Sequence, residues 1–182
     1  TFLKSRTLMN LDSEEEGALY VGCSGGKDSI GRWKIDLEKP PAGSAPVHVK
    51  VGGLKGGHSG LEIDKGRGNA IKILNRLLLE LTDIGGRISS MEGGNKHNAI
   101  PREAEAIVFL PKKNLEKAKT LVEAFSTMAR AELASAEPDL AITMAVQKSG
   151  KGRVIAKGQQ KKLLKTIAAL PHWVTKMSGD IP

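Results

Sequence analysis

The chain has 182 residues, 40% of them hydrophobic but only 3% aromatic, which is enough for one core or for one domain with a piece of another. Its net charge of +8 is compatible with a nucleic-acid partner, but the basic residues are spread widely and there is no aromatic platform for stacked bases, so we expect no nucleic acid. One cysteine excludes an intramolecular disulfide, no apolar run approaches the roughly 20 residues that span a bilayer, and the first residues lack the apolar block of a signal peptide. These properties predict a cytoplasmic protein that does not associate with membranes.

The first 25 residues read as a separate unit. Short apolar runs predict strands over residues 7–11 and 18–22, on either side of an acidic cluster at residues 12–16. Ser24, Gly25 and Gly26 then mark a break in the pattern. We therefore expect one domain boundary here, with residues 1–25 on one side and residues 26–182 on the other.

Residues 32–38 alternate between polar and apolar side chains, which is the period of a half-buried strand. Residues 47–51 repeat this alternation after a turn rich in proline and glycine. The two segments are predicted to form a hairpin with a longer loop.

Six segments with clear periodicity form the centre of the chain: strand 47–51, helix 69–84, strand 87–91, strand 104–110, a helix that begins near Pro111 and is closed by Pro138, and strand 140–146. The order strand, helix, strand, strand, helix, strand is that of the ferredoxin-like split βαβ fold. We predict an α+β protein with an antiparallel sheet, helices on one face, and an edge strand that could pair with a second copy. A helix over residues 160–170 and a short strand over residues 173–177 are expected to follow.

The loop over residues 52–60 contains five glycines and one histidine, His58. It has neither the Gly-Lys-Ser/Thr of a Walker loop nor the glycine spacing of a dinucleotide-binding turn. Glycines let the backbone approach a ligand closely, and a histidine held by them could stabilise a developing oxyanion. Equally, His58 could be an ordinary surface histidine on a flexible loop.

Two further residues, Asp12 and Asn98, could each have either a functional role or a purely structural one. Asp12 begins the acidic cluster and follows an apparent strand, where a carboxylate can hold a divalent metal or simply form a solvated turn. Asn98 precedes Ala-Ile-Pro in a glycine-containing turn, where its amide could contact a substrate carbonyl or carboxylate, or only support the turn.

Five segments taken together, in the same order along the chain, resemble the bacterial aminoacyl-histidine dipeptidases, which are similar to zinc aminoacylases and glutamate-releasing carboxypeptidases. The segments are Leu-Asp-Ser-Glu-Glu-Glu-Gly at 11–17, Gly-Cys-Ser-Gly-Gly at 22–26, Leu-Lys-Gly-Gly-His-Ser-Gly at 54–60, Gly-Asn-Ala at 68–70 and Asn-Ala-Ile-Pro-Arg-Glu-Ala at 98–104. The third and fifth are specific in combination, whereas either alone would be a moderate signal.

The resemblance implies a two-metal peptidase, with zinc as the expected metal, that hydrolyses short peptides such as Xaa-His. In such an enzyme a lid domain interrupts the catalytic domain and forms the homodimer. Residues 1–25 would end one half of the catalytic domain, and residues 26–182 would be the lid. By position, Asp12 resembles a metal ligand, His58 a lid histidine that holds the substrate carbonyl in the partner's active site, and Asn98 a lid residue that contacts substrate.

Several parts of the family's metal site have no counterpart in the chain. There is no His-x-Asp motif, bridging aspartate, base glutamate or C-terminal metal histidine, and Lys176 stands where relatives often have arginine. We therefore expect a fragment that retains no metal and is inactive alone. The alternative is a non-catalytic, ferredoxin-like dimeric module that binds an anionic ligand or RNA.

Overall fold

The computed structural model describes residues 4, 6–7, 9, 16–20, 25–148, 152–177 and 179 of the protein. The chain divides into two units, Thr1–Trp33 and Lys34–Pro182. Within the first unit, the described residues form no helix and no strand, so the strand predicted at 18–22 is absent over residues 18–20. Most of the strand predicted at 7–11 lies outside the described residues. The boundary expected after residue 25 stays a prediction.

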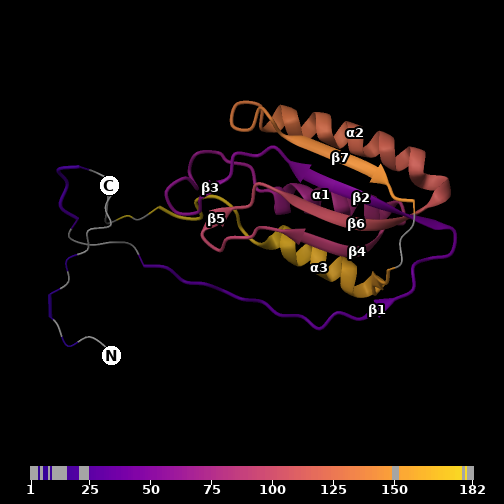
Figure 1. Ribbon diagram of the computed structural model, residues 1–182, viewed down its shortest axis with the longest axis horizontal. Helices are drawn as coiled ribbons and strands as arrows, with labels where there is room; N and C mark the ends of the chain where they lie inside the picture. The colour runs from indigo at the N-terminus through magenta and orange to yellow at the C-terminus, as the bar shows by residue number, and fades with distance from the viewer. Residues whose placement is uncertain are drawn as a thin grey trace. The chain divides into compact units, whose positions relative to one another are not determined.

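A four-stranded antiparallel sheet with the strand order β4-β6-β2-β7 organises the second unit (Figure 1). Its strands are β2 (Ser44–Gly52), β4 (Arg87–Gly93), β6 (Ala104–Pro111) and β7 (Ala141–Val146). Among the four strands of this sheet, the last in the chain (β7) lies beside the first (β2), and the second (β4) lies beside the third (β6). This is the ferredoxin-like order, so the predicted α+β split βαβ fold is confirmed.

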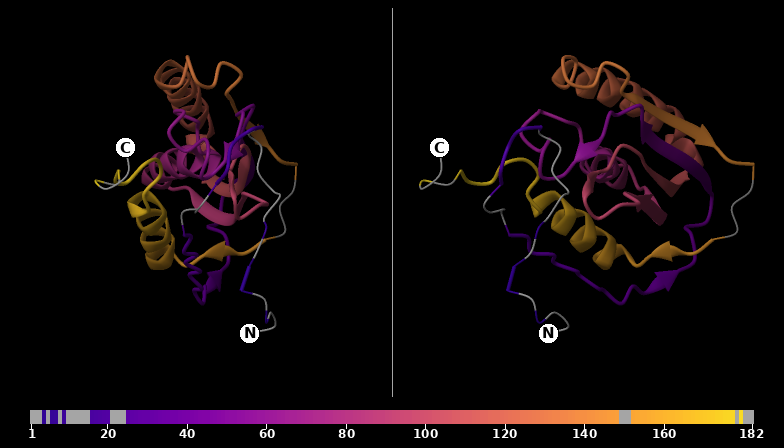
Figure 2. Two further views of the ribbon diagram at one scale, coloured as in Figure 1. Left: turned by 90° about the vertical axis from the view of Figure 1, so that its left-hand side faces the viewer. Right: turned by 60° about the vertical axis from the view of Figure 1, so that its left-hand side comes forward.

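Helices α1 (Ala70–Asp83) and α2 (Leu115–Glu132) pack against the face of the sheet that contains Val47, Val49 and Val51. Figure 2 shows α2 running along β7, while a third helix lies at the opposite edge. The helix α1 begins where Asn69 accepts a hydrogen bond from the backbone N–H of Lys72 (3.2 Å), which satisfies one of the free amides of the first turn. Its largest fully buried side chains are leucines: Leu74, Leu77, Leu78 and Leu81.

Helix α2 begins near its predicted position, after the 3₁₀ turn η1 (Lys112–Asn114), but it ends earlier than predicted. It stops at Glu132 rather than at Pro138, and tight turns occupy the residues between them. The backbone N–H of Glu137 donates to the carbonyl of Leu133 (2.7 Å) in one of these turns. The spacing of apolar residues in the sequence does not distinguish the last turn of a helix from isolated turns that follow it.

The predicted hairpin between residues 32–38 and 47–51 is wrong. Strand β2 pairs with β6 and β7, whereas β1 (Leu37–Glu38) pairs with β8 (Val154–Ile155) in a separate two-stranded ladder. Alternating hydrophobicity fixes which face of a strand is buried, but it does not select the strand's partner.

Helix α3 (Lys157–Ala169) covers one side of α1, close to its predicted range. Lys72 reaches across and donates to the carbonyls of Ile167, Ala168 and Leu170 at 2.6–2.8 Å, which satisfies the free end of that helix. The strand predicted at 173–177 does not form. Trp173 has a φ of +87°, which is incompatible with an extended strand. No helix among the described residues is long and apolar enough to cross a membrane.

The two edges of the main sheet differ. At the β4 edge, the side chain of Gln160 accepts a hydrogen bond from the backbone N–H of Ile88 (2.8 Å), and Ser89 Oγ donates to the carbonyl of Arg153 (2.8 Å). At the β7 edge, no described segment pairs with the outer side of the strand. The sheet is therefore closed by side chains at one edge and open at the other.

Candidate functional site

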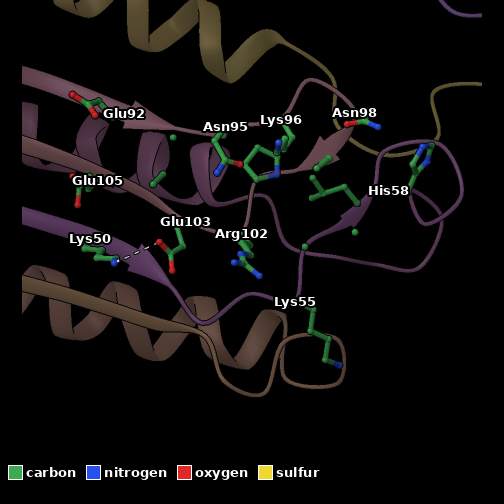
Figure 3. A pocket seen from close by; sticks show the side chains of 18 of the residues that line it. Lys50, Lys55, His58, Glu92, Asn95, Lys96, Asn98, Arg102, Glu103 and Glu105 are labelled. Carbon is green, nitrogen blue, oxygen red and sulfur yellow. Dashed lines mark ion pairs between the residues drawn. The ribbon is translucent and has the colours of Figure 1, made fainter.

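The glycine-rich loop and the Asn-Ala-Ile-Pro segment lie side by side. Strand β3 (Gly57–His58) pairs antiparallel with β5 (Ala99–Ile100), with His58 opposite Ala99. The backbone N–H of Ser59 also donates to the carbonyl of Asn98 (3.0 Å). His58 and Asn98, which were picked out separately from the sequence, therefore lie at the same end of one pocket (Figure 3).

Two of the loop glycines are required by their conformation and surroundings. Gly56 has a φ of +67° and Gly57 a φ of +146°, which L-residues with side chains rarely adopt. A Cβ on Gly56 would lie 3.2 Å from the carbonyl oxygen of Ile100, and one on Gly57 would lie 2.5 Å from Oε2 of Glu62. Glycine thus allows the loop to pack closely on both β5 and its own returning chain.

The ring of His58 is held by backbone amides. Its Nδ1 lies 3.1 Å from the backbone nitrogen of Gly60 and 3.2 Å from that of Leu61, and both N–H groups donate to it. A neutral imidazole has one acceptor nitrogen and one donor nitrogen, so these two bonds assign the ring proton to Nε2. His58 is exposed, and it therefore presents an N–H donor to whatever occupies the space beyond it.

Glu62 secures the tip of the loop. Its Oε2 accepts the backbone N–H of His58 (2.9 Å), and its Oε1 lies 3.1 Å from Nη2 of Arg67 and 3.5 Å from Nζ of Lys65. We call residues 55–68 the His58 arm; they form most of the connection between the end of β2 at Gly52 and the start of α1 at Ala70. Sequence analysis missed Glu62, although its position four residues after His58 places it within reach in a tight turn.

The tip of the arm is expected to loosen when Glu62 is protonated. The backbone N–H of His58, helped by the charges of Lys65 and Arg67 and opposed by partial burial, holds the pKa of Glu62 below its ordinary value of 4.5. Because the pKa is lowered on folding, this bond is fully present above pH 4.5 and is lost as the pH falls through the lower, folded-state value. In the full-length protein with isotope-labelled histidine, the amide resonance of His58 should titrate with a midpoint below 4.5. Glu62→Gln should abolish the titration, and a midpoint at or above 4.5 in the native protein would contradict the bond.

The pocket beside the β3–β5 ladder has a volume of about 910 Å³ and continues onto the sheet face opposite to α1 and α2. Acidic and basic side chains share its lining, and Lys50 Nζ lies 3.6 Å from Oε2 of Glu103 (Figure 3). The side chains of Lys96 and Arg102 also line it, and neither has an ion-pair partner among the described residues. The pocket therefore offers hydrogen-bond donors and unpaired positive charge. Sequence analysis did not select Arg102, although it lies only four residues after Asn98.

Of the other three histidines, His48 and His172 contact neighbouring polar groups, and His97 is exposed in a turn. His48 Nε2 lies 3.0 Å from Oε2 of Glu105 on the open face of the sheet. His172 Nδ1 lies 3.3 Å from Nδ2 of Asn69, and its Nε2 lies 3.2 Å from the carbonyl oxygen of Arg67. His97 is exposed in the turn before Asn98.

Metal ligands do not gather in the part of the chain that the structure describes. No three His, Cys, Asp or Glu side chains there come together in a way that could hold a metal ion. Asp12, the predicted ligand, lies outside the described residues. The side chains of the described residues thus do not supply the ligands of the two-metal site that the sequence resemblance implies.

Comparison with known proteins agrees with this fold and loop arrangement. Residues 49–137 match the family model described as a peptidase dimerisation domain. This segment contains the end of β2, the His58 arm, α1, β4, β6 and α2.

The relatives are dipeptidases. The chain is 37% identical over 178 residues to the cytosol non-specific dipeptidase of Escherichia coli (strain K12), a match that covers 97% of this chain and 36% of the relative. In structure it is similar to the aminoacylhistidine dipeptidase of Vibrio alginolyticus, with a TM-score of 0.78 and 33% identity over 82% of this chain and 30% of the other. The chain spans about a third of the length of each. The predicted resemblance to dipeptidases is therefore confirmed.

Proposed function

We propose that this chain is the lid and dimerisation portion of a dipeptidase that hydrolyses short peptides such as Xaa-His. The dimerisation-domain match and the two dipeptidase relatives support this proposal, because together they cover the sheet, the His58 arm and the Asn98 turn. The observation that carries it is the ring of His58, whose Nδ1 is occupied by two backbone amides. The free Nε2–H is the kind of fixed donor that acyl-transfer sites use.

Hydrolysis of a peptide bond passes through a tetrahedral intermediate in which the carbonyl oxygen becomes an oxyanion. In our proposal, Nε2–H of His58 donates to this oxygen, and its orientation is set before the charge develops. Asn98 lies at the same end of the pocket and can donate its side-chain amide to a carbonyl or carboxylate of the peptide. The unpaired guanidinium of Arg102 further favours a ligand that carries a carboxylate.

The resemblance also implies a homodimer in which His58 serves the partner's active site, a cytoplasmic location, and two divalent metal ions, expected to be zinc. The described residues do not supply the ligands for those ions, so no step above depends on them. Asp12 as a metal ligand remains a prediction for a part of the chain outside the described residues.

The proposal is tested with the full-length protein and with the 182-residue chain. We expect the full-length protein to release histidine from an Xaa-His dipeptide, to lose this activity on treatment with a metal chelator, and to regain it when a divalent metal is added back. The 182-residue chain alone should show no hydrolysis above the uncatalysed rate. A chain that cleaved the dipeptide at a rate saturating in zinc would refute the fragment assignment. Salt-sensitive RNA binding without hydrolysis by the full-length protein would favour the binding-module alternative.

A further inference from the structure

The turn between α2 and β7 contains a buried carboxylate, Glu137, which is only 1% exposed. We propose that Glu137 is a positioning residue for His58: it closes the base of the His58 arm by holding the arm's first and last backbone amides. This inference rests on the proposed role of His58 as the oxyanion donor. It concerns a side chain from a different part of the chain, 79 positions beyond His58 in the numbering.

The geometry at Glu137 is a two-point clasp. Its Oε2 accepts the backbone N–H of Lys55 (2.7 Å), and its Oε1 accepts the backbone N–H of Gly68 (2.8 Å). These amides are the two ends of the arm, and everything between them, His58 included, projects from this closed base. Only a carboxylate presents two acceptor oxygens in this way, because a glutamine would put an N–H₂ group against one of the two N–H donors.

Glu137 has no ion-pair partner among the described residues, so its negative charge is satisfied by backbone amides. Hydrogen bonds to an ionised acceptor are about twice as strong as neutral ones, and leaving such a buried group unpaired is costly. The clasp is therefore a site where the arm is held firmly. By contrast, Glu62 at the tip joins two parts of the arm to each other and does not fix the arm to the sheet.

The residues around the clasp leave the base of the arm little room to shift. A Cβ on Gly68 would lie 2.8 Å from Cδ2 of Leu54, 3.3 Å from Cγ of Glu137 and 3.3 Å from Cδ1 of Leu133. Gly53, with a φ of +75°, lies directly against the carbonyl of Asp139. Leu54 is itself part of the core cluster. The arm thus begins and ends on the segment that follows α2, and Glu137 links that segment to both ends.

The link to function follows from the precision that an oxyanion donor needs. Displacement of a catalytic group by about 1 Å can lower the rate about 100-fold. Because the ring of His58 is oriented only by amides of its own arm, its place in the protein depends on how the arm is attached. The described attachments are the β3–β5 ladder with the Ser59–Asn98 hydrogen bond beside it, the contact between Nε2 of His172 and the carbonyl oxygen of Arg67, and the Glu137 clasp. Among these, the clasp is the one that holds both ends of the arm.

The test uses Glu137→Gln in the full-length enzyme, assayed under conditions where circular dichroism shows it to be folded. We expect kcat to fall about tenfold with KM changed less than about threefold, because the donor is misplaced while most substrate contacts remain. The matched control is Glu132→Gln, which removes a carboxylate from the end of α2 that pairs with Arg76 and does not touch the arm. Its kcat should stay within about twofold of the native value.

Two readouts separate positioning from a general loss of stability. In the double variant His58→Ala/Glu137→Gln, kcat should equal that of His58→Ala alone, since Glu137 acts through His58; additive losses would overturn the proposal. Hydrogen exchange should be at least about tenfold faster at the amides of Lys55 and Gly68 in Glu137→Gln, with α1 unchanged. Unchanged exchange there would also overturn it.

If Glu137→Gln does not fold, Glu137→Asp keeps the charge and withdraws it by one methylene, and the same exchange and double-variant criteria apply. The exchange result does not depend on whether His58 is catalytic, so a failed clasp is distinguishable from a failed dipeptidase assignment.

Discussion

Replacing His58 by alanine in the full-length enzyme should lower kcat for an Xaa-His dipeptide about 10²–10³-fold, the usual loss when one oxyanion donor is removed. The side chain is exposed and its Nδ1 bonds stay within the arm, so the substitution removes an N–H donor at little cost to the core. KM should change much less than kcat, since the bond to a charged oxygen is made in the transition state rather than with the bound peptide. Steady-state kinetics on matched protein preparations measures both constants.

His97→Ala is the control for this experiment. His97 is also an exposed histidine, and it lies in the turn just before Asn98, but it does not line the pocket. Its replacement should leave kcat within about twofold of the native value. If His58→Ala retained a normal kcat, His58 would have no part in the reaction and the proposed mechanism would fall.

The central elements of the fold could be predicted because each carries its own local signal. Helix α1 has a leucine face at helical spacing, an Asn69 cap and a terminating Gly85 with a φ of +91°. The valines of β2 alternate so regularly that the sequence alone indicates which face of the strand is buried. The order of these elements then selected the ferredoxin-like arrangement, since few other ways of packing two helices on one sheet satisfy the connections.

Partner choice could not be predicted for the short strands. β1 and β8 are two residues long and lie more than a hundred positions apart, so neither segment has a local signal that indicates the other as its partner. Residues 173–177 were predicted as a short strand, but the positive φ of Trp173 is incompatible with extended backbone. Both errors come from patterns that report burial of a segment without reporting its hydrogen-bond partners.

The site was partly visible in the sequence. The glycines around His58 and the turn before Pro101 each indicated a place where the backbone approaches another group closely. Neither segment indicated that the two pair with each other. The ring orientation of His58 arises from backbone amides, which have no residue-type signature. Glu137 was missed for a similar reason: in a turn before a proline, a glutamate reads as solvent-exposed, and only the fold shows that two amides converge on it.

The second large effect is expected at the open edge of the sheet, in β7. Gln147 donates its backbone N–H to the carbonyl of Pro46 (2.9 Å), and in an antiparallel ladder such bonded pairs alternate with unbonded ones. The amides of Ile142, Met144 and Val146 therefore point away from β2, toward the free side of the strand. Since residues 49–137 match the family model of a peptidase dimerisation domain, we expect the β7 strands of two copies to pair here.

Met144→Pro in the full-length enzyme should convert the dimer to a monomer at micromolar concentration. Proline removes the outward N–H and obstructs the approach of a second strand, while every bond between β7 and β2 is kept. Because the two-fold symmetry repeats the loss, about 3 kcal/mol of pairing is removed and the dissociation constant should rise at least about 100-fold. Light scattering coupled to size-exclusion chromatography over a dilution series measures this constant.

Met144→Ala is the matched control, since it removes the same side chain from the core but keeps the amide. It should lower the free energy of unfolding yet remain dimeric at the same concentration.

The proline variant should also lose activity in proportion to the monomer fraction, because a lid histidine that serves the partner's active site has no substrate within reach in a monomer. An active monomer would show that His58 acts within its own subunit, and a proline variant that stayed dimeric would place the interface on another surface. The two measurements together thus decide where the copies meet and whether that contact completes the catalytic site.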